Sequence, residues 1–291
     1  MGFSALAIVG PTASGKSGLA LSLVEALESS GQPAEIINAD AMQLYRGMDI
    51  GTAKLPENER RGIEHHLIDA IEPSAEMTAA EYSKLAIDTA NAIRARGKLP
   101  VFVGGSMFYL AAALDYFDFA PTDRYIRDQL ESQAEVVGNL EMHNQLSRLD
   151  PESGQKIHSN NVRKVIRALE VIQITGLPFA SSLPDPEYLV PTVTIGIDVD
   201  REVLKPRIAN RVAEMWSQGL IDEAGRLLEG KASLSKTALA AIGYQQAFQQ
   251  ISGELDEASA IQDTIRLTNR YARRQMSWFK RDRRTHWLPD S

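Results

Sequence analysis

The octet that decides the fold of this chain is GPTASGKS, residues 10–17, which follows the apolar run Ala5–Val9. It has the pattern G-x-x-x-x-G-K-[ST], which is typical of a phosphate-binding loop between a strand and a helix. The glycines permit a tight turn, and backbone N–H groups at the start of the helix face an anion. We therefore expect a di- or triphosphate to be held by the whole octet, that is by Gly10, Pro11, Thr12, Ala13, Ser14, Gly15, Lys16 and Ser17.

Lys16 and Ser17 have the most specific roles in such a loop. We expect Lys16 to contact the outer phosphate and the Ser17 hydroxyl to ligate Mg²⁺. No N-K-x-D guanine-reading motif follows in the sequence, and no apolar strand ends in an obvious Walker-B aspartate. These absences disfavour a switch or motor ATPase, and they leave open a transferase that binds its substrate's own phosphates.

Strand-like and helical segments alternate through the first part of the chain. The segments Ala5–Val9, Glu35–Asn38 and Pro100–Val103 are expected strands, and Ala79–Arg96 is an expected helix. This alternation predicts an α/β fold, namely a P-loop NTPase-like parallel sheet flanked by helices. Ligands of such folds bind at the carboxyl ends of the strands, where we expect three residues to converge: Gly10, Asp40 and Gly104.

A helical insertion is expected in the middle of the chain. Strand signals vanish from about Pro121 to Pro184, and Thr192–Val199 then returns to strand character. We therefore predict a first core part over residues 1–120, an all-helical subdomain over 121–185, and core completion over 186–291. The expected helices are Arg124–Val136, Leu140–Leu149 and Asn161–Ile174 in the insertion, and Glu257–Arg281 near the end.

Composition excludes several classes of protein. The 291 residues are 44% hydrophobic and include no cysteine, so a disulfide framework, a thiolate zinc site and a cysteine nucleophile are all excluded. No apolar run approaches the ~18 residues of a membrane span, and a cytoplasmic location is expected. The formal net charge is −7, yet the last part of the chain is locally basic, so a phosphate-bearing partner remains possible: Arg270, Arg273, Arg274, Lys280, Arg281, Arg283 and Arg284.

Further motifs occur in a fixed order and resemble those of one family. They are DAMQLYRGMDIGTAK (40–54), HHLID (65–69), GGSMFY (104–109), IHSNN…RALEV (157–171), AIGY (241–244) and RRQMSWFKR (273–281). In this order, together with the phosphate loop, they resemble the bacterial tRNA dimethylallyltransferases. The resemblance covers nearly the whole chain.

The resemblance implies a reaction and its catalytic residues. It implies transfer of a dimethylallyl group from dimethylallyl diphosphate to the N6 amine of the adenosine immediately 3′ of the tRNA anticodon. Asp40 would accept the proton of that amine, and Ser106 would hydrogen-bond near the reacting centre or cap the following helix. Arg211, and after it Arg207, would reach the pyrophosphate beside Lys16, with Mg²⁺ as the cofactor.

The resemblance also implies an RNA surface for the anticodon stem-loop, to which the helical insertion over 121–185 contributes, on an enzyme expected to be a monomer. Four basic side chains of the last helix are expected to lie along one stripe of its surface: Arg270, Arg274, Arg281 and Arg284. The residues that match the family's tRNA contacts are Asp40, Ala41, Met42, Gln43, Ser106, Arg127, Arg163, Lys164, Arg167, Gly243, Tyr244, Arg273, Arg274, Gln275, Trp278 and Lys280.

Three positions depart from the family pattern. Ala41 replaces a common serine, Asn161 replaces an aspartate, and Gln245 stands where a basic residue is common. We expect these changes to affect RNA affinity more than transfer chemistry.

The adjacent His65 and His66 would point in different directions, which favours a structural use over metal binding.

Two rival functions stay open on the sequence alone. An ATP-dependent kinase of a small molecule or nucleotide would share the phosphate loop, Mg²⁺ and an aspartate after the second strand. A non-catalytic RNA-binding protein would give Asp40 no special task.

Overall fold

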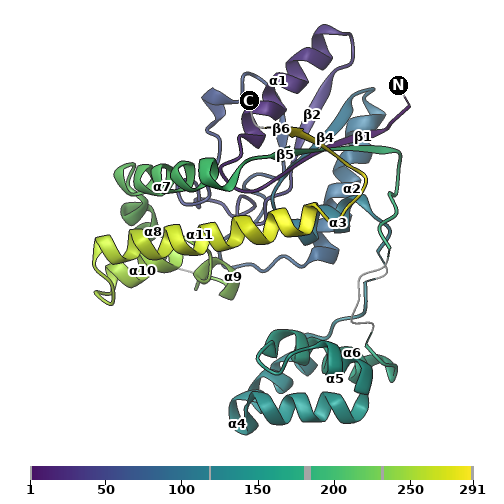
Figure 1. The fold of residues 1–291 in the computed structure, drawn as a ribbon, viewed down its shortest axis with the longest axis vertical. Helices are drawn as coiled ribbons and strands as arrows, with labels where there is room; N and C mark the ends of the chain where they lie inside the picture. Colours follow the sequence, from purple (N-terminus) through teal and green to yellow (C-terminus); the bar gives the residue numbers. More distant parts are fainter. Residues whose placement is uncertain (1, 118, 180–184, 231–232, 290–291) are drawn as a thin grey trace. The chain divides into compact units, whose positions relative to one another are not determined.

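The computed structural model describes residues 2–117, 119–179, 185–230 and 233–289, and these form two compact units. The core unit comprises Met1–Tyr116 and Pro186–Ser291, and the helical unit comprises Phe117–Asp185 (Figure 1). Residues 180–184, where the predicted insertion ends, lie outside the described residues.

The core unit is built on one six-stranded sheet in the order β3-β2-β4-β1-β5-β6. All five strand pairs are parallel, so the predicted parallel α/β architecture is confirmed. Val9 at the end of β1 pairs with Gly104 of β4 and Gly196 of β5, which places these strand ends at one edge. The strands are β1 Ala5–Val9, β2 Ala34–Asn38, β3 His65–His66, β4 Leu99–Gly104, β5 Thr192–Asp198 and β6 Thr285–Pro289.

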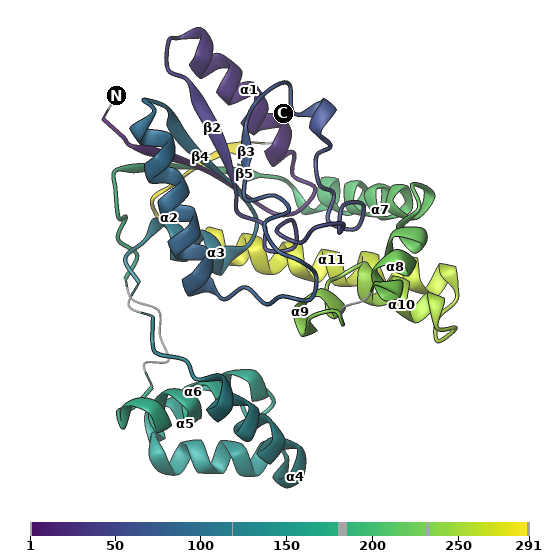
Figure 2. The ribbon, with the colours of Figure 1, turned by 180° about the vertical axis from the view of Figure 1, so that it is seen from behind.

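Alternate residues of β1 are buried in two separate hydrophobic cores, one on each face of the sheet. Leu6 and Ile8 of β1 pack with α1 on one face, while Ala5, Ala7 and Val9 pack with α2, α3 and the end of α11 on the other. Burial on both faces explains why β1 is apolar along its whole length instead of alternating. Figures 1 and 2 show these helices from opposite sides: α1 Lys16–Ser29, α2 Ala79–Ala95, α3 Met107–Leu114 and α11 Glu257–Phe279.

A second group of helices completes the core unit beside the sheet. Helix α11 packs along α7 and α10 (Figure 2), and α8 packs on α10. Tyr45 and Met48, from the segment after β2, are buried against this group. The group consists of α7 Arg201–Ser217, α8 Leu220–Glu229, α9 Lys236–Leu239 and α10 Tyr244–Ile251. A short 3₁₀ helix, η1 Glu57–Glu59, lies between β2 and β3 in the chain and is not part of this group.

The helical unit contains α4 Arg124–Leu149, α5 Pro151–Lys156 and α6 Val162–Thr175. Gly138 has φ 81° and ψ 163° inside α4, so α4 is two helices joined at a break, as the sequence predicts. Its core packs Leu130 and Met142 of α4 against Val165 of α6. None of the helices in the described ranges is long and apolar enough to cross a membrane.

The last segment of the chain differs from the sequence expectation. Helix α11 ends at Phe279 and the chain continues into β6, so the predicted basic stripe is wrong for Arg281 and Arg284. The Arg284 guanidinium instead binds the carboxylates of Asp115 (2.6 Å) and Asp282 (2.6 Å) and lies 3.7 Å from the ring centroid of Tyr188. These contacts raise the pKa of Arg284 and give it a structural role.

Candidate functional site

The phosphate loop joins β1 to α1 at the carboxyl edge of the sheet. Gly10 (φ 151°), Ala13 (φ 62°) and Gly15 (φ 86°) have positive φ, which turns the chain sharply between the two elements. Gly15 is the N-cap of α1, and none of the described side chains bonds to that cap. The first amides of α1 therefore remain available to an anion.

The Lys16 side chain folds back over its own loop. Its Nζ donates to the Pro11 carbonyl oxygen at 2.6 Å. Burial lowers the pKa of Lys16 from 10.5 to about 8; the negative charge of Asp40 opposes this shift and the positive charge of Arg211 adds to it. A lysine with little water around it, placed near a carboxylate and a second cation, is suited to receive a phosphate group.

Two loop hydroxyls differ in their surroundings. The Ser14 Oγ is buried and has no hydrogen-bond partner among the described residues. Ser17 is exposed in the first turn of α1. A buried hydroxyl with no acceptor fits a ligand oxygen, and an exposed hydroxyl at this position offers the hard oxygen that Mg²⁺ prefers.

Asp40 follows β2 and is fixed by the side chain of Asn38. The Asn38 Nδ2 donates to the carbonyl oxygens of Asp40 (3.0 Å) and Leu67 (2.9 Å), and the Asp40 N–H donates to the Asn38 Oδ1 (3.0 Å). The Asp40 carboxylate accepts the Met42 N–H at 3.0 Å. Burial raises the pKa of Asp40, and the Met42 N–H and the Lys16 charge oppose that rise. This carboxylate is held in one orientation and is a candidate proton acceptor.

Ser106 joins the turn after β4 to the turn after β2. Its Oγ accepts the Ala41 N–H at 2.8 Å, and its N–H donates to the Ala39 carbonyl oxygen at 3.2 Å. Ser106 is the N-cap residue of α3, but its hydroxyl makes no cap hydrogen bond to that helix. A Cβ at Gly104 would lie 2.1 Å from the Ala39 oxygen, so glycine is required where the two turns meet.

Helix α11 contributes two side chains whose positions the sequence did not reveal. The Gln275 Oε1 accepts the Thr12 N–H at 2.9 Å, and its Nε2 donates to the Gly105 carbonyl oxygen at 2.9 Å. One turn earlier, the Tyr271 hydroxyl lies 3.4 Å from the same oxygen, close to Ser106. Burial, aided by the charge of Asp40, raises the pKa of Tyr271 to about 12. Tyr271 and Gln275 are spaced i, i+4 on an amphipathic helix, so they share one face of it. This spacing is the feature of the sequence that could have indicated their common position.

The two arginines of α7 differ in their positions. Arg211 is half-buried and its charge acts on Lys16, whereas Arg207 is exposed. Burial lowers the pKa of Arg211. The structure therefore brings Arg211 toward the phosphate loop.

The residues expected to contact RNA fall into two groups in the core unit. Arg273 and Arg274 are exposed on α11, Gln43 is half-buried, and Lys280 is exposed and paired with Asp198 at 3.1 Å. Others are occupied inside the protein: Gln275 is 1% exposed and Tyr244 is 0% exposed, with Gly243 buried beside it and Trp278 packed on the core. The expectation of RNA contact by the side chains of Gln275 and Tyr244 does not match this structure.

Tyr244, from the AIGY motif, instead supports the segment after β2. Its hydroxyl donates to the buried Glu223, which also accepts the Ile50 N–H at 3.0 Å and the Asp49 N–H at 3.2 Å. A Cβ at Gly51 would lie 2.5 Å from the Tyr244 ring. This packing fixes the backbone that leads away from Asp40, Ala41, Met42 and Gln43.

In the helical unit, two of the expected RNA contacts surround a buried acid. Glu170 is 0% exposed and accepts Arg127 at 2.7 Å and Arg167 at 2.8 Å. Hydrogen bonds from both arginines and from Thr122 outweigh the effect of burial and lower the pKa of Glu170 to about 2. Arg163 is exposed and Lys164 is half-buried on the same helix.

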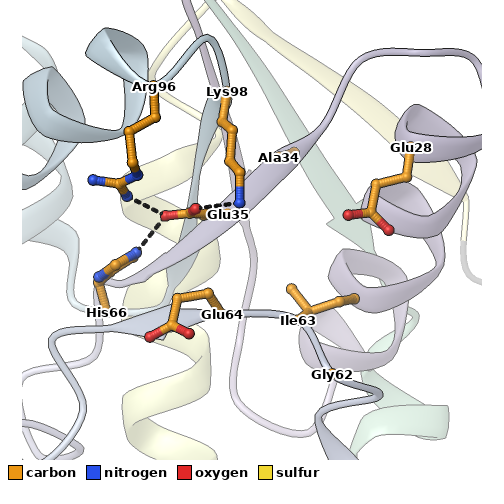
Figure 3. A pocket seen from close by; sticks show the side chains of 9 residues that line it. All are labelled: Glu28, Ala34, Glu35, Gly62, Ile63, Glu64, His66, Arg96 and Lys98. Carbon is orange, nitrogen blue, oxygen red and sulfur yellow. Dashed lines mark hydrogen bonds and ion pairs between the residues drawn. The ribbon is translucent and has the colours of Figure 1, made fainter.

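A pocket of about 450 Å³ lies near the amino end of β2, away from the phosphate loop. In Figure 3, Arg96, Lys98 and His66 all point at the Glu35 carboxylate, at 2.5, 2.7 and 2.7 Å. Three hydrogen bonds to these side chains lower the pKa of Glu35 to about 2. These three side chains are therefore already paired with a buried carboxylate.

A parallel α/β sheet with a phosphate loop at its carboxyl edge, and with Asp40 and Ser106 near that loop, defines a P-loop NTPase-like fold. Residues 43–282 match the IPP transferase family model. The chain belongs to that family.

Curated relatives and solved structures agree with this assignment. A tRNA dimethylallyltransferase of Thermobifida fusca (strain YX) is 49% identical over 284 residues, which cover 98% of this chain and 89% of the relative. One of Streptomyces avermitilis is 47% identical and covers 97% and 89%. The full-length tRNA isopentenylpyrophosphate transferase of Bacillus halodurans is similar with a TM-score of 0.70 at 37% identity, covering 98% and 89%. A eukaryotic dimethylallyltransferase acting on tRNA has a TM-score of 0.80 at 26% identity, covering 99% and 74%.

Proposed function

We propose that this enzyme transfers the dimethylallyl group of dimethylallyl diphosphate to the N6 amine of the adenosine immediately 3′ of the anticodon in tRNA. The observation that supports this most is the placement of Asp40, a fixed carboxylate, within electrostatic reach of Lys16 in the phosphate loop. The two groups serve opposite needs of one substitution reaction. One accepts a proton while the other holds a departing anion.

The chemistry follows from the charges that develop during transfer. The allylic C–O bond breaks as the adenine nitrogen attacks, and negative charge builds on the departing pyrophosphate. Loop amides, Lys16 and Arg211 would stabilise that charge. Asp40 would take the proton released from the amine, and its burial-raised pKa makes it a better base than a fully hydrated carboxylate. Ser106 and Tyr271 would orient the reacting groups, since both lie beside Asp40.

The donor set fits Mg²⁺, a hard cation that takes oxygen ligands and keeps several waters. The exposed Ser17 hydroxyl would hold it together with oxygens of the diphosphate. When bound, the ion would neutralise charge on the leaving group.

The tRNA would bind with its anticodon stem-loop at this site. The target base must leave its stack to meet the donor, because the reacting carbon is held at the sheet edge. Exposed Arg273 and Arg274 on α11 and Arg163 on α6 would contact phosphates. We expect a monomer in the cytoplasm, where tRNA is available.

The test combines purified protein, Mg²⁺, unmodified tRNA and labelled dimethylallyl diphosphate, with ATP in a parallel reaction. Incorporation of label into RNA, without use of ATP, is the expected result. Phosphate transfer from ATP with no label in RNA would instead identify a kinase. RNA binding without any covalent product would identify a binding protein.

A further inference from the structure

Gln275 uses both ends of its carboxamide to join two loops of the site. It accepts the Thr12 N–H of the phosphate loop and donates to the Gly105 carbonyl oxygen, which immediately precedes Ser106, each at 2.9 Å. The side chain is 1% exposed, so neither bond competes with bulk water. Gln275 thus links the diphosphate side of the site to the Ser106 side.

The local packing is built around this amide. A Cβ at Gly105 would lie 2.2 Å from the Gln275 Nε2, so position 105 must be glycine for the amide to lie where it does. The neighbouring Arg273 and Arg274 are exposed. One turn of α11 therefore presents cations to solvent and an amide to the site.

We propose that Gln275 is a positioning residue of the transfer site. It fixes the phosphate loop at Thr12 against the turn that carries Ser106, and so sets the distance between the bound diphosphate and the Asp40–Ser106 pair. This inference rests on the proposed function for its kinetic consequence, while its binding consequence is independent of it. Gln275 acts from inside the protein and touches neither RNA nor the reacting atoms.

Gln275→Met is the first variant, because methionine has a similar size and removes both hydrogen bonds. We expect the Kd for inorganic pyrophosphate to rise about tenfold and the single-turnover transfer rate to fall about 100-fold, as expected when two buried groups lose their partners and the reactants lose alignment. The Kd for tRNA should stay within about twofold, since the side chain lies inside the protein. Thr264→Val is the matched control: Thr264 is also buried on α11, and its hydroxyl bonds only to the Ala260 carbonyl oxygen among the described residues.

Gln275→Glu provides a second readout that a packing role would not give. A protonated carboxyl group has one acceptor and one donor, as the amide does, and burial raises its pKa. The transfer rate of this variant, divided by that of the wild type, should therefore rise as the pH falls from about 8 to about 6.

Three results would overturn the inference: unchanged pyrophosphate binding in a folded Gln275→Met protein, loss of tRNA affinity alone, or a flat pH ratio for Gln275→Glu. The proposed function is tested separately. If the wild type fails to modify tRNA, that function is wrong, while the pyrophosphate measurement still decides the role of Gln275.

Discussion

Replacing Lys16 with methionine should make the ligand-free protein more stable at neutral pH while removing its affinity for diphosphate. Burial lowers the pKa of Lys16 from 10.5 to about 8, which means that the folded state disfavours the charged ammonium. The proposed binding of diphosphate would require a charged lysine at this position. Methionine is of similar length and carries no charge.

The size of the effect follows from the pKa. A lowering from 10.5 to about 8 corresponds to about 3 kcal/mol, because one pH unit is worth about 1.4 kcal/mol. The hydrogen bond to Pro11 is lost in the variant, at about 1 kcal/mol, which leaves a net gain of about 2 kcal/mol. Below pH 8 Lys16 is protonated in both the folded and the unfolded state, so the full cost of burying its charge is present. Between about pH 8 and 10.5 the unfolded state binds more protons than the folded state, so the stability of the wild type rises with pH. The advantage of the variant should therefore shrink over that window.

Urea unfolding followed by tryptophan fluorescence measures this directly. Trp216, Trp278 and Trp287 are the three tryptophans of the chain, and all belong to the core unit, so the signal reports that unit. Lys84→Met is the matched control, because the Lys84 side chain is 81% exposed. If the Lys16→Met protein is no more stable than the wild type at pH 7, or if its advantage persists undiminished at pH 10, then burial of the Lys16 charge does not destabilise the folded protein. Added pyrophosphate should stabilise the wild type and leave the variant unaffected.

Three further predictions concern the base, the helical unit and the RNA surface. Asp40→Asn should lower the single-turnover transfer rate by at least about 100-fold with tRNA affinity within a few fold; a parallel loss of both would make Asp40 a binding residue. Glu170→Gln should destabilise the helical unit by about 3 kcal/mol, because two arginines lose a buried partner. Hydrogen exchange over residues 119–179 would show this, with the difference present above the ordinary pKa of 4.5 and lost as the pH falls toward 2; unaltered protection at neutral pH would contradict it. Arg274→Ala should reduce the salt slope of tRNA binding by about 1, whereas Arg266→Ala, which removes a partner of Asp263, should not; equal slopes would remove Arg274 from the phosphate contacts.

The fold was predictable where local pattern and tertiary structure agree. The apolar run before GPTASGKS, the periodic helix after it and the Gly-terminated strand at Gly104 identify a parallel sheet with a phosphate loop. Two strands were missed for a physical reason. Strand β3 has two residues, and β6 begins only six positions after the end of α11, in a segment rich in charge. Both are strands because the sheet edge supplies partners, which no local pattern records.

The expected site residues lie near one another in the structure, but their contacts could not be predicted from the sequence. The loop motif and the family resemblance identified Lys16, Asp40 and Ser106, and the structure places these groups around one edge of the sheet. The same motifs did not indicate that Gln275 faces inward. Gln275 lies in the basic segment 273–281, which as a whole was expected to contact RNA. Which side of a helix meets a loop far away in sequence depends on packing between distant segments.

The position at which the label enters the tRNA decides whether this protein carries out the proposed transfer. After reaction with labelled dimethylallyl diphosphate, the tRNA would be digested and its fragments analysed by mass spectrometry. We expect one dimethylallyl group on N6 of the adenosine immediately 3′ of the anticodon, and one equivalent of pyrophosphate released. Unmodified RNA, or pyrophosphate released without a prenylated adenosine, would contradict it.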